Sequence, residues 1–336
     1  MPAADTGTAP SCPAVPAGDV LRVERLSVRF RMRGRPPVAA VSDATFRLAA
    51  GECLVLVGES GCGKSVLASA LLGLLPGNAE TAGSAFLADG LDLLAADERT
   101  LARTVRGRRV GLVPQSPAAH LTPVRTVRSH LEETVRALGG AAVGTGGRRE
   151  RAARVRAAAE RAARRAAFPP GHLDRYPHEL SGGLAGRAAT ALALVGDAPL
   201  LLADEPTTGL DRQLAEAVVD ELRACTRDTG RALLMITHDL AAAERIADTV
   251  AVMYAGRIVE TTAAGEFFGA GGPRHPYARG LLDALPERAF TPVPGVPPEL
   301  GALPPGCAFA ARCPKADALC AGQRPEFTEG TACHHA

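Results

Sequence analysis

An eight-residue segment at positions 58–65 carries the residue types that bind nucleotide phosphates. It consists of Gly58, Glu59, Ser60, Gly61, Cys62, Gly63, Lys64 and Ser65 and matches the pattern G-x4-G-K-S in full. The glycines let successive backbone N–H groups turn toward a phosphate, and a helix that begins there adds the positive end of its dipole. Lys64 is expected to reach the β and γ phosphates and Ser65 to ligate Mg²⁺. Alone, this phosphate loop predicts only that the chain binds a nucleotide.

Two adjacent acids, Asp204 and Glu205, follow the apolar run at 200–203. A carboxylate at the carboxyl end of a buried strand can hold Mg²⁺ in a dry crevice, and Asp204 has that position. Because the chain turns where the strand ends, Glu205 can face the same site and accept a proton from an attacking water. The alternative is a surface Asp-Glu pair before Pro206, which the preceding apolar residues disfavour.

The hydrophobic pattern predicts the elements that position these residues. Residues from about 20 to 57 predict strands, and the apolar run at 53–57 predicts a buried parallel strand that leads into the phosphate loop. Lys64 to Leu75 predicts a helix that stops at Pro76-Gly77. Alternating strands and helices imply an α/β fold with a mainly parallel sheet. Further strands are predicted at 108–115, 200–205, 232–239 and 249–260, and helices from 116 to about 178 with a break at 139–147.

Composition limits the classes of function. With 336 residues, 46% of them hydrophobic and 22% charged, the chain is typical of a globular protein of about two domains. A net charge of +2 provides no global attraction to nucleic acid or anionic lipid. The apolar runs are too short to span a bilayer, so any role at a membrane is expected to be peripheral. Residues 1–18 lack the features of a secretory signal and predict a disordered Pro/Ala tail.

An arginine-rich run covers residues 148–165, with eight Arg, two Glu and mostly Ala otherwise. One hypothesis is a helix that binds nucleic acid, and the other is a solvated helix of high propensity. We favour the solvated helix, because no aromatic residues interleave and the whole chain is nearly neutral. No nucleic-acid partner is therefore expected.

Four cysteines, Cys307, Cys313, Cys320 and Cys333, lie within the Pro-rich last 64 residues. This density is typical of a metal site. The gaps are wider than the C-x2-4-C pairs of most zinc sites, and four thiolates also suit an iron–sulfur cluster. Two disulfides, which a reducing compartment disfavours, and unlinked structural cysteines remain as alternatives.

The segment Leu180-Ser181-Gly182-Gly183, between the phosphate loop and the acidic pair, resembles the signature of ATP-binding-cassette (ABC) ATPases. In that family the signature acts on ATP held by a second subunit, so the resemblance implies a dimer in which Ser181, Gly182 and Gly183 complete the partner's site. It also implies roles for three residues that follow strands or the acidic pair. Gln115 would sense Mg²⁺ and the membrane subunit, His238 would touch the γ-phosphate, and Asp211 would contact the partner subunit.

The segment at 273–282 and the cysteines that follow resemble the C-terminal extension of ATP-binding subunits from oligopeptide, dipeptide and nickel importers. The resemblance implies a 4Fe–4S cluster on the four cysteines. It implies an ATP-hydrolysing domain at 19–268, with a helical subdomain at about 116–190, and a small extension at 269–336. It also implies a location at the cytoplasmic face of the membrane. The implied partners are a related second ATPase subunit, two membrane permeases and an extracytoplasmic substrate-binding protein.

Two departures from the family pattern and two alternatives stay open. Gly186 stands where glutamine is usual after the signature, and glycine inside a helix costs about 1 kcal/mol relative to alanine. No aromatic residue for stacking on adenine occurs near Arg35-Pro36-Pro37, which leaves Phe30 or an arginine. The substrate could be nickel or a metal chelate instead of a peptide. A different class, a non-transport ABC ATPase acting on nucleic acid or ribosomes, is disfavoured by the C-terminal extension.

Overall fold

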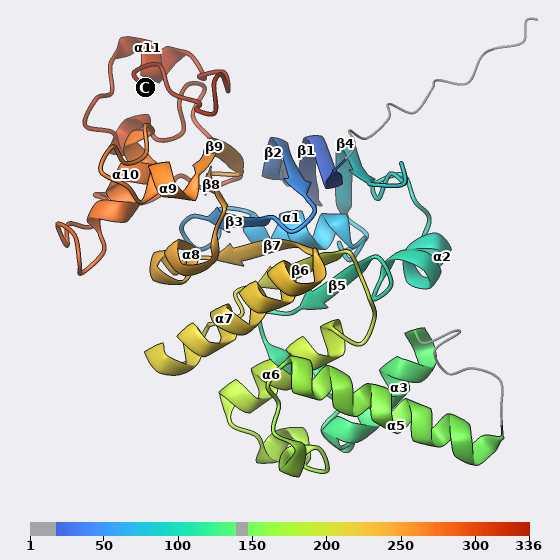
Figure 1. The fold of residues 1–336 in the computed structure, drawn as a ribbon. Helices are drawn as coiled ribbons and strands as arrows, with labels where there is room; N and C mark the ends of the chain where they lie inside the picture. The colour runs from blue at the N-terminus through green and yellow to red at the C-terminus, as the bar shows by residue number, and fades with distance from the viewer. Residues whose placement is uncertain (1–17, 139–146) are drawn as a thin grey trace, which may run out of the picture.

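Residues 18–138 and 147–336 of the computed structural model are described, and they form two β-sheets flanked by helices (Figure 1). The larger sheet has the strand order β5-β6-β7-β3-β8-β9 and is parallel except for β9, which pairs antiparallel with β8. The mainly parallel α/β sheet expected from the sequence is therefore present. Its strands are β3 (Cys53–Val57), β5 (Val110–Val113), β6 (Leu200–Asp204), β7 (Ala232–Thr237), β8 (Thr249–Tyr254) and β9 (Arg257–Ala263).

Both faces of this sheet are buried, which explains its nearly continuous apolar strands. Along β3, Leu54 and Leu56 join the cluster under the second sheet, while Val55 and Val57 join the cluster on the opposite face. The helices packed around the sheet include α1 (Lys64–Leu71), α7 (Arg212–Thr229) and α8 (Leu240–Ile246). The phosphate loop thus leaves a strand that is fixed from both sides.

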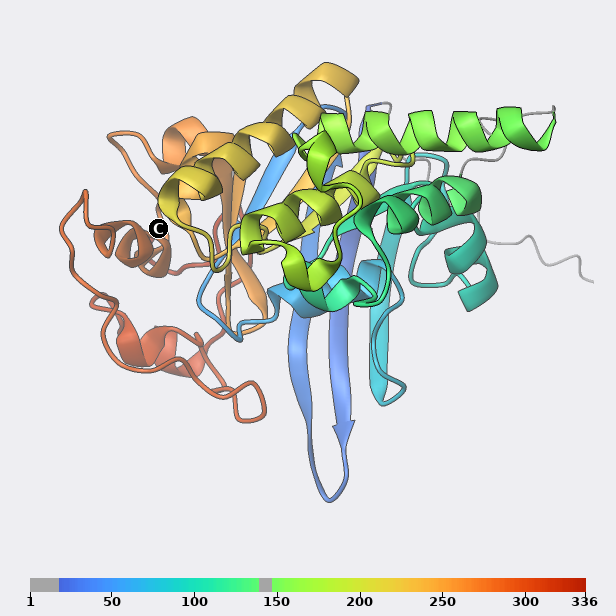
Figure 2. The same ribbon diagram turned by 90° about the horizontal axis from the view of Figure 1, so that it is seen from below.

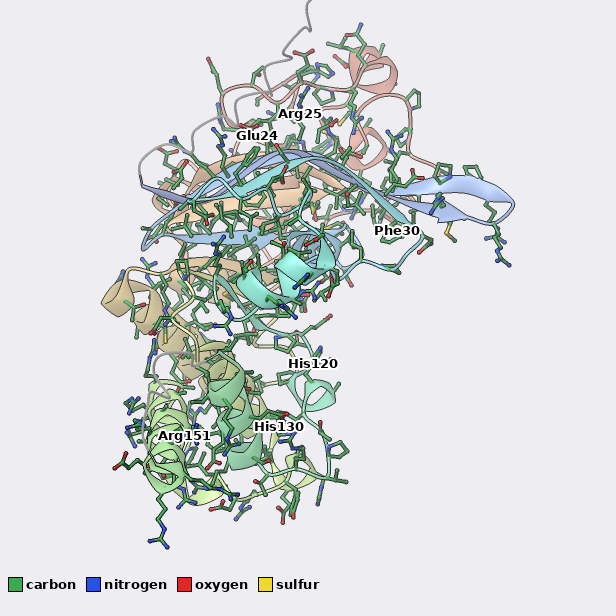
Figure 3. The ribbon with its side chains drawn as sticks, turned by 90° about the vertical axis from the view of Figure 1, so that its right-hand side faces the viewer. Glu24, Arg25, Phe30, His120, His130 and Arg151 are labelled. Atoms are coloured by element: carbon green, nitrogen blue, oxygen red, sulfur yellow. The ribbon has the colours of Figure 1, made fainter. Side chains whose placement is uncertain are left out.

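The smaller sheet is antiparallel, in the order β2-β1-β4, and packs against α1. Its strands are β1 (Asp19–Met32), β2 (Arg35–Ala49) and β4 (Ala79–Leu87), and the far end of the β1–β2 hairpin extends beyond the rest of the molecule (Figure 2). Phe30, labelled in Figure 3, is half-buried on β1 and packs against the apolar cluster shared by this sheet and α1. After β4 come α2 (Glu98–Thr100) and a π-helical turn, η1 (Leu101–Val105).

A helical layer lies below the parallel sheet in Figure 1. Its long helix α5 places Val155, Ala159 and Ala163 in the core, while the arginines at its start are exposed, including Arg151, labelled in Figure 3. The arginine-rich run is therefore a helix with one buried apolar stripe and a solvated charged face. The layer comprises η2 (Pro117–His120), α3 (Val127–Leu138), α5 (Arg148–Arg165), η3 (Pro170–His172), η4 (Pro177–Glu179) and α6 (Gly182–Ala193).

Three element boundaries differ from the sequence prediction. The helix that starts at Lys64 ends at Leu71, not Leu75, because Gly73 adopts a left-handed φ of 61° that a helix cannot continue. The strand predicted at 108–115 covers only Val110–Val113, since Pro114 cannot donate a ladder hydrogen bond. The segment 249–260 is a hairpin of β8 and β9 turning at Ala255 and Gly256, which both have positive φ. Residues 1–17 of the predicted tail lie outside the described residues. So do residues 139–146 of the break predicted at 139–147.

The C-terminal segment lies beside β8 and β9, at the left in Figure 1. It contains α9 (Ala264–Phe267), α10 (Pro276–Asp283), η5 (Ala310–Arg312) and α11 (Ala318–Gly322). Its buried residues Tyr277, Ala278 and Phe309 belong to the same apolar cluster as β3 and β7, so this segment shares the core of the parallel sheet. Among residues 18–138 and 147–336, no helix combines the length and apolar character that crossing a bilayer requires.

Candidate nucleotide site

The carboxyl ends of four parallel strands meet at one edge of the large sheet. The strand register pairs Val57 with Thr237, Asp204 with Ile236, and Val113 with Ala203. The phosphate loop, the acidic pair, His238 and Gln115 all follow these strand ends, and such an edge is where open α/β sheets bind ligands. A hollow there is lined by Gly58, Glu59, Ser60, Gln115, Glu205 and His238, together with Val57, Leu240 and Leu281.

The phosphate loop is pressed against neighbouring backbone. Gly58 and Gly63 have φ of 154° and 109°, and a Cβ on either would lie 2.2 Å from a carbonyl oxygen, of Met253 or Ala40 respectively. Only glycine fits such positions without moving the backbone. The loop therefore has one well-defined path from β3 into α1.

Lys64 lies inside the curve of this loop and is only 4% exposed. Its ammonium donates to the carbonyl oxygen of Gly58 at 2.7 Å and to that of Glu59 at 3.0 Å. Its charge also acts on the carboxyls of Asp204 and Glu205. A buried cation in a loop of inward-turned backbone groups is the arrangement that binds a polyphosphate.

Ser65 and Asp204 form the metal side of the site. The Ser65 hydroxyl donates to Asp204 Oδ1 at 3.0 Å. Burial raises the pKa of Asp204 above its usual range, an effect that the Ser65 hydrogen bond and the Lys64 charge oppose and the Glu205 charge reinforces. A hydroxyl and a carboxylate oxygen side by side are hard donors of the kind that Mg²⁺ prefers, so these residues fit the ion.

Glu205 is held in a strained conformation next to His238. Its φ of 46° is unusual for a residue other than glycine, and only 8% of the residue is exposed to solvent. Its Oε2 lies 2.9 Å from His238 Nδ1 and accepts the Thr208 hydroxyl at 2.8 Å. Burial raises the pKa of Glu205, but hydrogen bonds from His238 and Thr208 and the Lys64 charge outweigh it, so the pKa is lowered overall. The carboxylate is therefore ionised at neutral pH and can act as a base.

The signature residues and Asp211 lie outside this hollow. Ser181 caps the N-terminus of α6 by accepting the Leu184 N–H at 3.3 Å, and Asp211 caps α7 by accepting the Leu214 N–H at 2.9 Å. Gly183 packs so tightly on Leu214 that a Cβ would lie 2.0 Å from that side chain. Ser181 and Gly182 are exposed. None of the signature residues is among those that line the hollow.

Sequence reasoning missed three residues around the phosphate loop: Thr208, Tyr277 and Arg312. Thr208 lies three residues before Asp211, but its hydrogen bond to Glu205 follows from a turn that the sequence alone does not specify. Tyr277 and Arg312 contact Glu59 from more than 200 positions away, at separations of 218 and 253 residues. Such long-range pairs leave no local signal in a single sequence.

The four C-terminal cysteines are free thiols. The Cys307 N–H donates to the Cys320 carbonyl at 2.8 Å. Burial is the main cause that raises the pKa of Cys307 above its usual range, and the neighbouring cysteines Cys320, Cys333 and Cys313 raise it further. Within the described part of the chain, the group whose ligand atoms fall within 4.8 Å of one another is Asp317, Cys320 and His335, not the four thiols.

Two protein-family models match the chain. The model described as "ABC transporter" matches residues 41–208, and the one described as "Oligopeptide/dipeptide transporter, C-terminal region" matches residues 259–320.

Curated relatives cover most of the chain. The oligopeptide transport ATP-binding protein OppD of Mycobacterium bovis is 39% identical over 94% of this chain, which spans only about half (51%) of that relative's length. The dipeptide transport ATP-binding protein DppD of Bacillus subtilis is 36% identical over 90% of this chain and 88% of its own length.

Solved structures share the fold. The ATP-binding cassette MJ0796, a dimer in a post-hydrolysis state bound to ADP and Pi, has a TM-score of 0.63 at 23% identity, covering 73% of this chain and 98% of that one. The cbiO1 protein from Clostridium perfringens, part of the cbiONQ transporter complex, has a TM-score of 0.60 at 24% identity, covering 76% and 92%. At these identities the likeness establishes the fold alone.

Proposed function

The chain belongs to the ABC transporter family, and from that premise we propose that it is the ATP-hydrolysing subunit of an importer for dipeptides or oligopeptides. One observation supports hydrolysis above the others: Lys64, Ser65, Asp204 and Glu205 come together at one sheet edge, with Glu205 ionised and oriented by His238. The C-terminal match and the names of the relatives support peptides as the transported class.

The residues that meet at this sheet edge divide the work of hydrolysis. Backbone N–H groups of residues 58–65 and the Lys64 ammonium bind the phosphates of ATP. Ser65, Asp204 and Gln115 would hold Mg²⁺, which supplies charge neutralisation at the β and γ phosphates. Glu205 takes a proton from the attacking water as that oxygen bonds to the γ phosphorus and the bond to ADP breaks. His238 keeps Glu205 in place and contacts the γ-phosphate.

The site needs a second subunit. Ser181 and Gly182 are exposed at the N-terminus of α6, where backbone N–H groups suit an anion, and Gly183 follows them, buried in the first turn. We infer that they complete the ATP site of a partner, with Asp211 at the same contact. This sequence carries one phosphate loop and one LSGG, and we propose that a second, related cassette supplies the other half. Two membrane permeases and an extracytoplasmic binding protein complete the importer at the cytoplasmic face of the membrane.

We propose that the four C-terminal cysteines hold a metal cluster rather than a single zinc ion. A tetrahedral zinc site with Zn–S bonds of about 2.3 Å needs sulfurs roughly 3.8 Å apart. No such grouping of the thiols occurs among residues 18–138 and 147–336. A 4Fe–4S cluster on Cys307, Cys313, Cys320 and Cys333 is the proposed occupant, and the match of this segment to the C-terminal region of oligopeptide and dipeptide transporters supports it. Protein purified without oxygen should be brown with about four iron atoms per chain, and colourless protein with stoichiometric zinc would overturn this assignment.

Purification from native membranes tests the proposed function. A tagged chain, extracted with mild detergent, should bring with it two permeases and a second ATPase subunit. The complex, reconstituted into vesicles with its binding protein, should take up labelled dipeptides or hexapeptides only with ATP. Uptake of Ni²⁺ but not peptide would select the nickel alternative, and copurification with ribosomes or nucleic acid without permeases would support the non-transport class.

A further inference from the structure

Glu59, the second residue of the phosphate loop, is bound by the C-terminal extension. Its carboxylate accepts two hydrogen bonds from the Arg312 guanidinium, at 2.7 and 2.9 Å. Its backbone N–H donates to the Tyr277 hydroxyl at 2.9 Å. Its carbonyl oxygen accepts the Lys64 ammonium at 3.0 Å. The residue that holds the phosphate-binding lysine is thus itself held by two residues from another part of the chain.

The pair between Arg312 and Glu59 is largely withdrawn from water. The Arg312 side chain is 4% exposed and that of Glu59 is 28% exposed. Arg312 also donates to the Pro294 carbonyl at 2.6 Å and to the Tyr254 hydroxyl at 3.3 Å. A buried guanidinium is stable only where its hydrogen bonds are satisfied, and the two-pronged contact fixes the direction of the carboxylate. These contacts therefore hold the Glu59 carboxylate in one position and orientation.

Tyr277 is equally fixed. Its ring is fully buried and packs on Tyr254 at 4.5 Å between centroids and on Phe309 at 5.4 Å. Its backbone N–H donates to His275 Nδ1 at 3.1 Å, which caps α10. The Tyr277 hydroxyl that accepts the Glu59 N–H is consequently held in place by an aromatic cluster. Loss of its oxygen would leave the Glu59 N–H without this partner.

We propose that Arg312 and Tyr277 are positioning residues of the nucleotide site, through which the C-terminal extension sets the shape of the phosphate loop and hence the affinity for nucleotide. This inference rests on the proposed function of that loop. Both residues reach the site through Glu59, whose carbonyl oxygen accepts the Lys64 ammonium, so they act on the phosphate loop rather than on the nucleotide. Linkage requires the reverse effect as well: bound nucleotide stabilises the packing of the extension.

Nucleotide affinity of the full chain tests the proposal, measured by titration calorimetry with MgADP. Arg312→Gln is expected to weaken binding about tenfold, within the range for residues that couple to a site without contacting the ligand. Arg312→Lys keeps the charge but not the two-pronged contact, so its affinity should fall between those of Arg312→Gln and the unchanged protein. Glu59→Gln should weaken binding like Arg312→Gln. The double variant should be no weaker than either single variant, since both remove the same interaction.

A matched control separates positioning from general damage. Arg245→Gln removes a two-pronged arginine contact to Asp220, at 2.6 and 2.7 Å, that lies outside the phosphate loop and the extension. It should leave the MgADP affinity unchanged. Tyr277→Phe should weaken binding about threefold while the melting temperature stays close to that of the unchanged protein.

The outcomes for this proposal and for the proposed function are distinct. If the unchanged protein binds no MgADP, both fail. If it binds and Lys64→Ala does not, while folded Arg312→Gln, Glu59→Gln and Tyr277→Phe keep the full affinity, the proposed function survives and the positioning role is wrong. If Arg312→Gln does not fold, Glu59→Gln and Tyr277→Phe decide, because they preserve side-chain volume. An unchanged KM for ATP with a lowered kcat in these variants would also contradict the proposal.

Discussion

Two regions of this chain differ in how many of their polar groups already have hydrogen-bond partners within the chain. The loop half consists of residues 58–65 with Asp204, Glu205 and His238, and the signature half consists of residues 180–183 and the rest of α6. In the loop half, Lys64 and Glu205 are nearly buried, and each makes at least two polar contacts. In the signature half, Ser181 and Gly182 are exposed at the start of α6. A site whose residues must be in position before the ligand binds is formed within one chain. The surface that we propose completes another chain's site is instead exposed. The following predictions test this contrast from the largest expected effect to the smallest.

Lys64→Ala is expected to abolish nucleotide binding. The change removes the buried cation that faces the phosphates and leaves the Gly58 and Glu59 carbonyls without their donor. Titration with MgADP measures the effect. The chain offers a matched control, since its other lysine, Lys315, is exposed in the C-terminal extension. Lys315→Ala should bind as the unchanged protein does, and an unchanged affinity in Lys64→Ala would refute the assignment of the phosphate loop.

Glu205→Gln should retain ATP and slow its hydrolysis by roughly 10²–10⁴-fold. Glutamine keeps the shape and the contact with Thr208 but cannot accept the proton. Because the pKa of Glu205 is lowered, the base stays ionised as the pH falls from 8 to 6, so turnover in the unchanged protein should not decline through this group. Phosphate release and ATP retention measure the two parts. Steady-state hydrolysis at the original rate in Glu205→Gln would assign the base to another residue.

His275, in the C-terminal extension, should make the free energy of unfolding depend on pH. Burial lowers its pKa to about 4 in the folded chain, against about 6.5 for an exposed histidine. The unfolded chain then binds the proton more readily, so stability is intact above pH 6.5 and is lost as the pH falls toward 4. The loss amounts to about 3 kcal/mol at most.

Urea unfolding between pH 7.5 and 4.5 checks this window. His275→Asn preserves a side-chain acceptor for the Tyr277 N–H but does not titrate, so its unfolding free energy should fall less over the same range. Carboxylates contribute equally to both proteins and cancel in the comparison. Identical pH profiles for the two proteins would contradict the burial of a neutral histidine at this position.

The sequence could predict some neighbours of the phosphate loop but not others, for a physical reason. Asp204, Glu205 and His238 were predictable because each follows an apolar strand, and the carboxyl ends of parallel strands share one edge. The partners of Glu59 were not, because Arg312 and Tyr277 reach it through tertiary packing. The helix end at Gly73 was also missed, since the sequence continues apolar to Leu75 while a left-handed glycine ends the helix.

The smallest prediction concerns Gly186, on the signature side. The residue lies buried within α6, and a Cβ built on it would meet no heavy atom within 4 Å. Gly186→Ala should therefore stabilise the chain by up to about 1 kcal/mol, because alanine restricts the unfolded chain without a clash. The matched change Gly183→Ala, three residues away on the same helix, should destabilise it by about 1–3 kcal/mol, because its Cβ would overlap Leu214.

Opposite shifts of the melting temperature in these two variants would locate the weakness of the signature helix at Gly186 and its tight contact with α7 at Gly183. If the helix instead needs flexibility at Gly186 to act on a partner's nucleotide, Gly186→Ala should raise the melting temperature and still lower ATP turnover in the assembled dimer. Its own MgADP affinity should stay unchanged in either case, because the loop half does not include α6. A lowered affinity in this variant would show that the two halves are coupled within one chain, against the contrast drawn above.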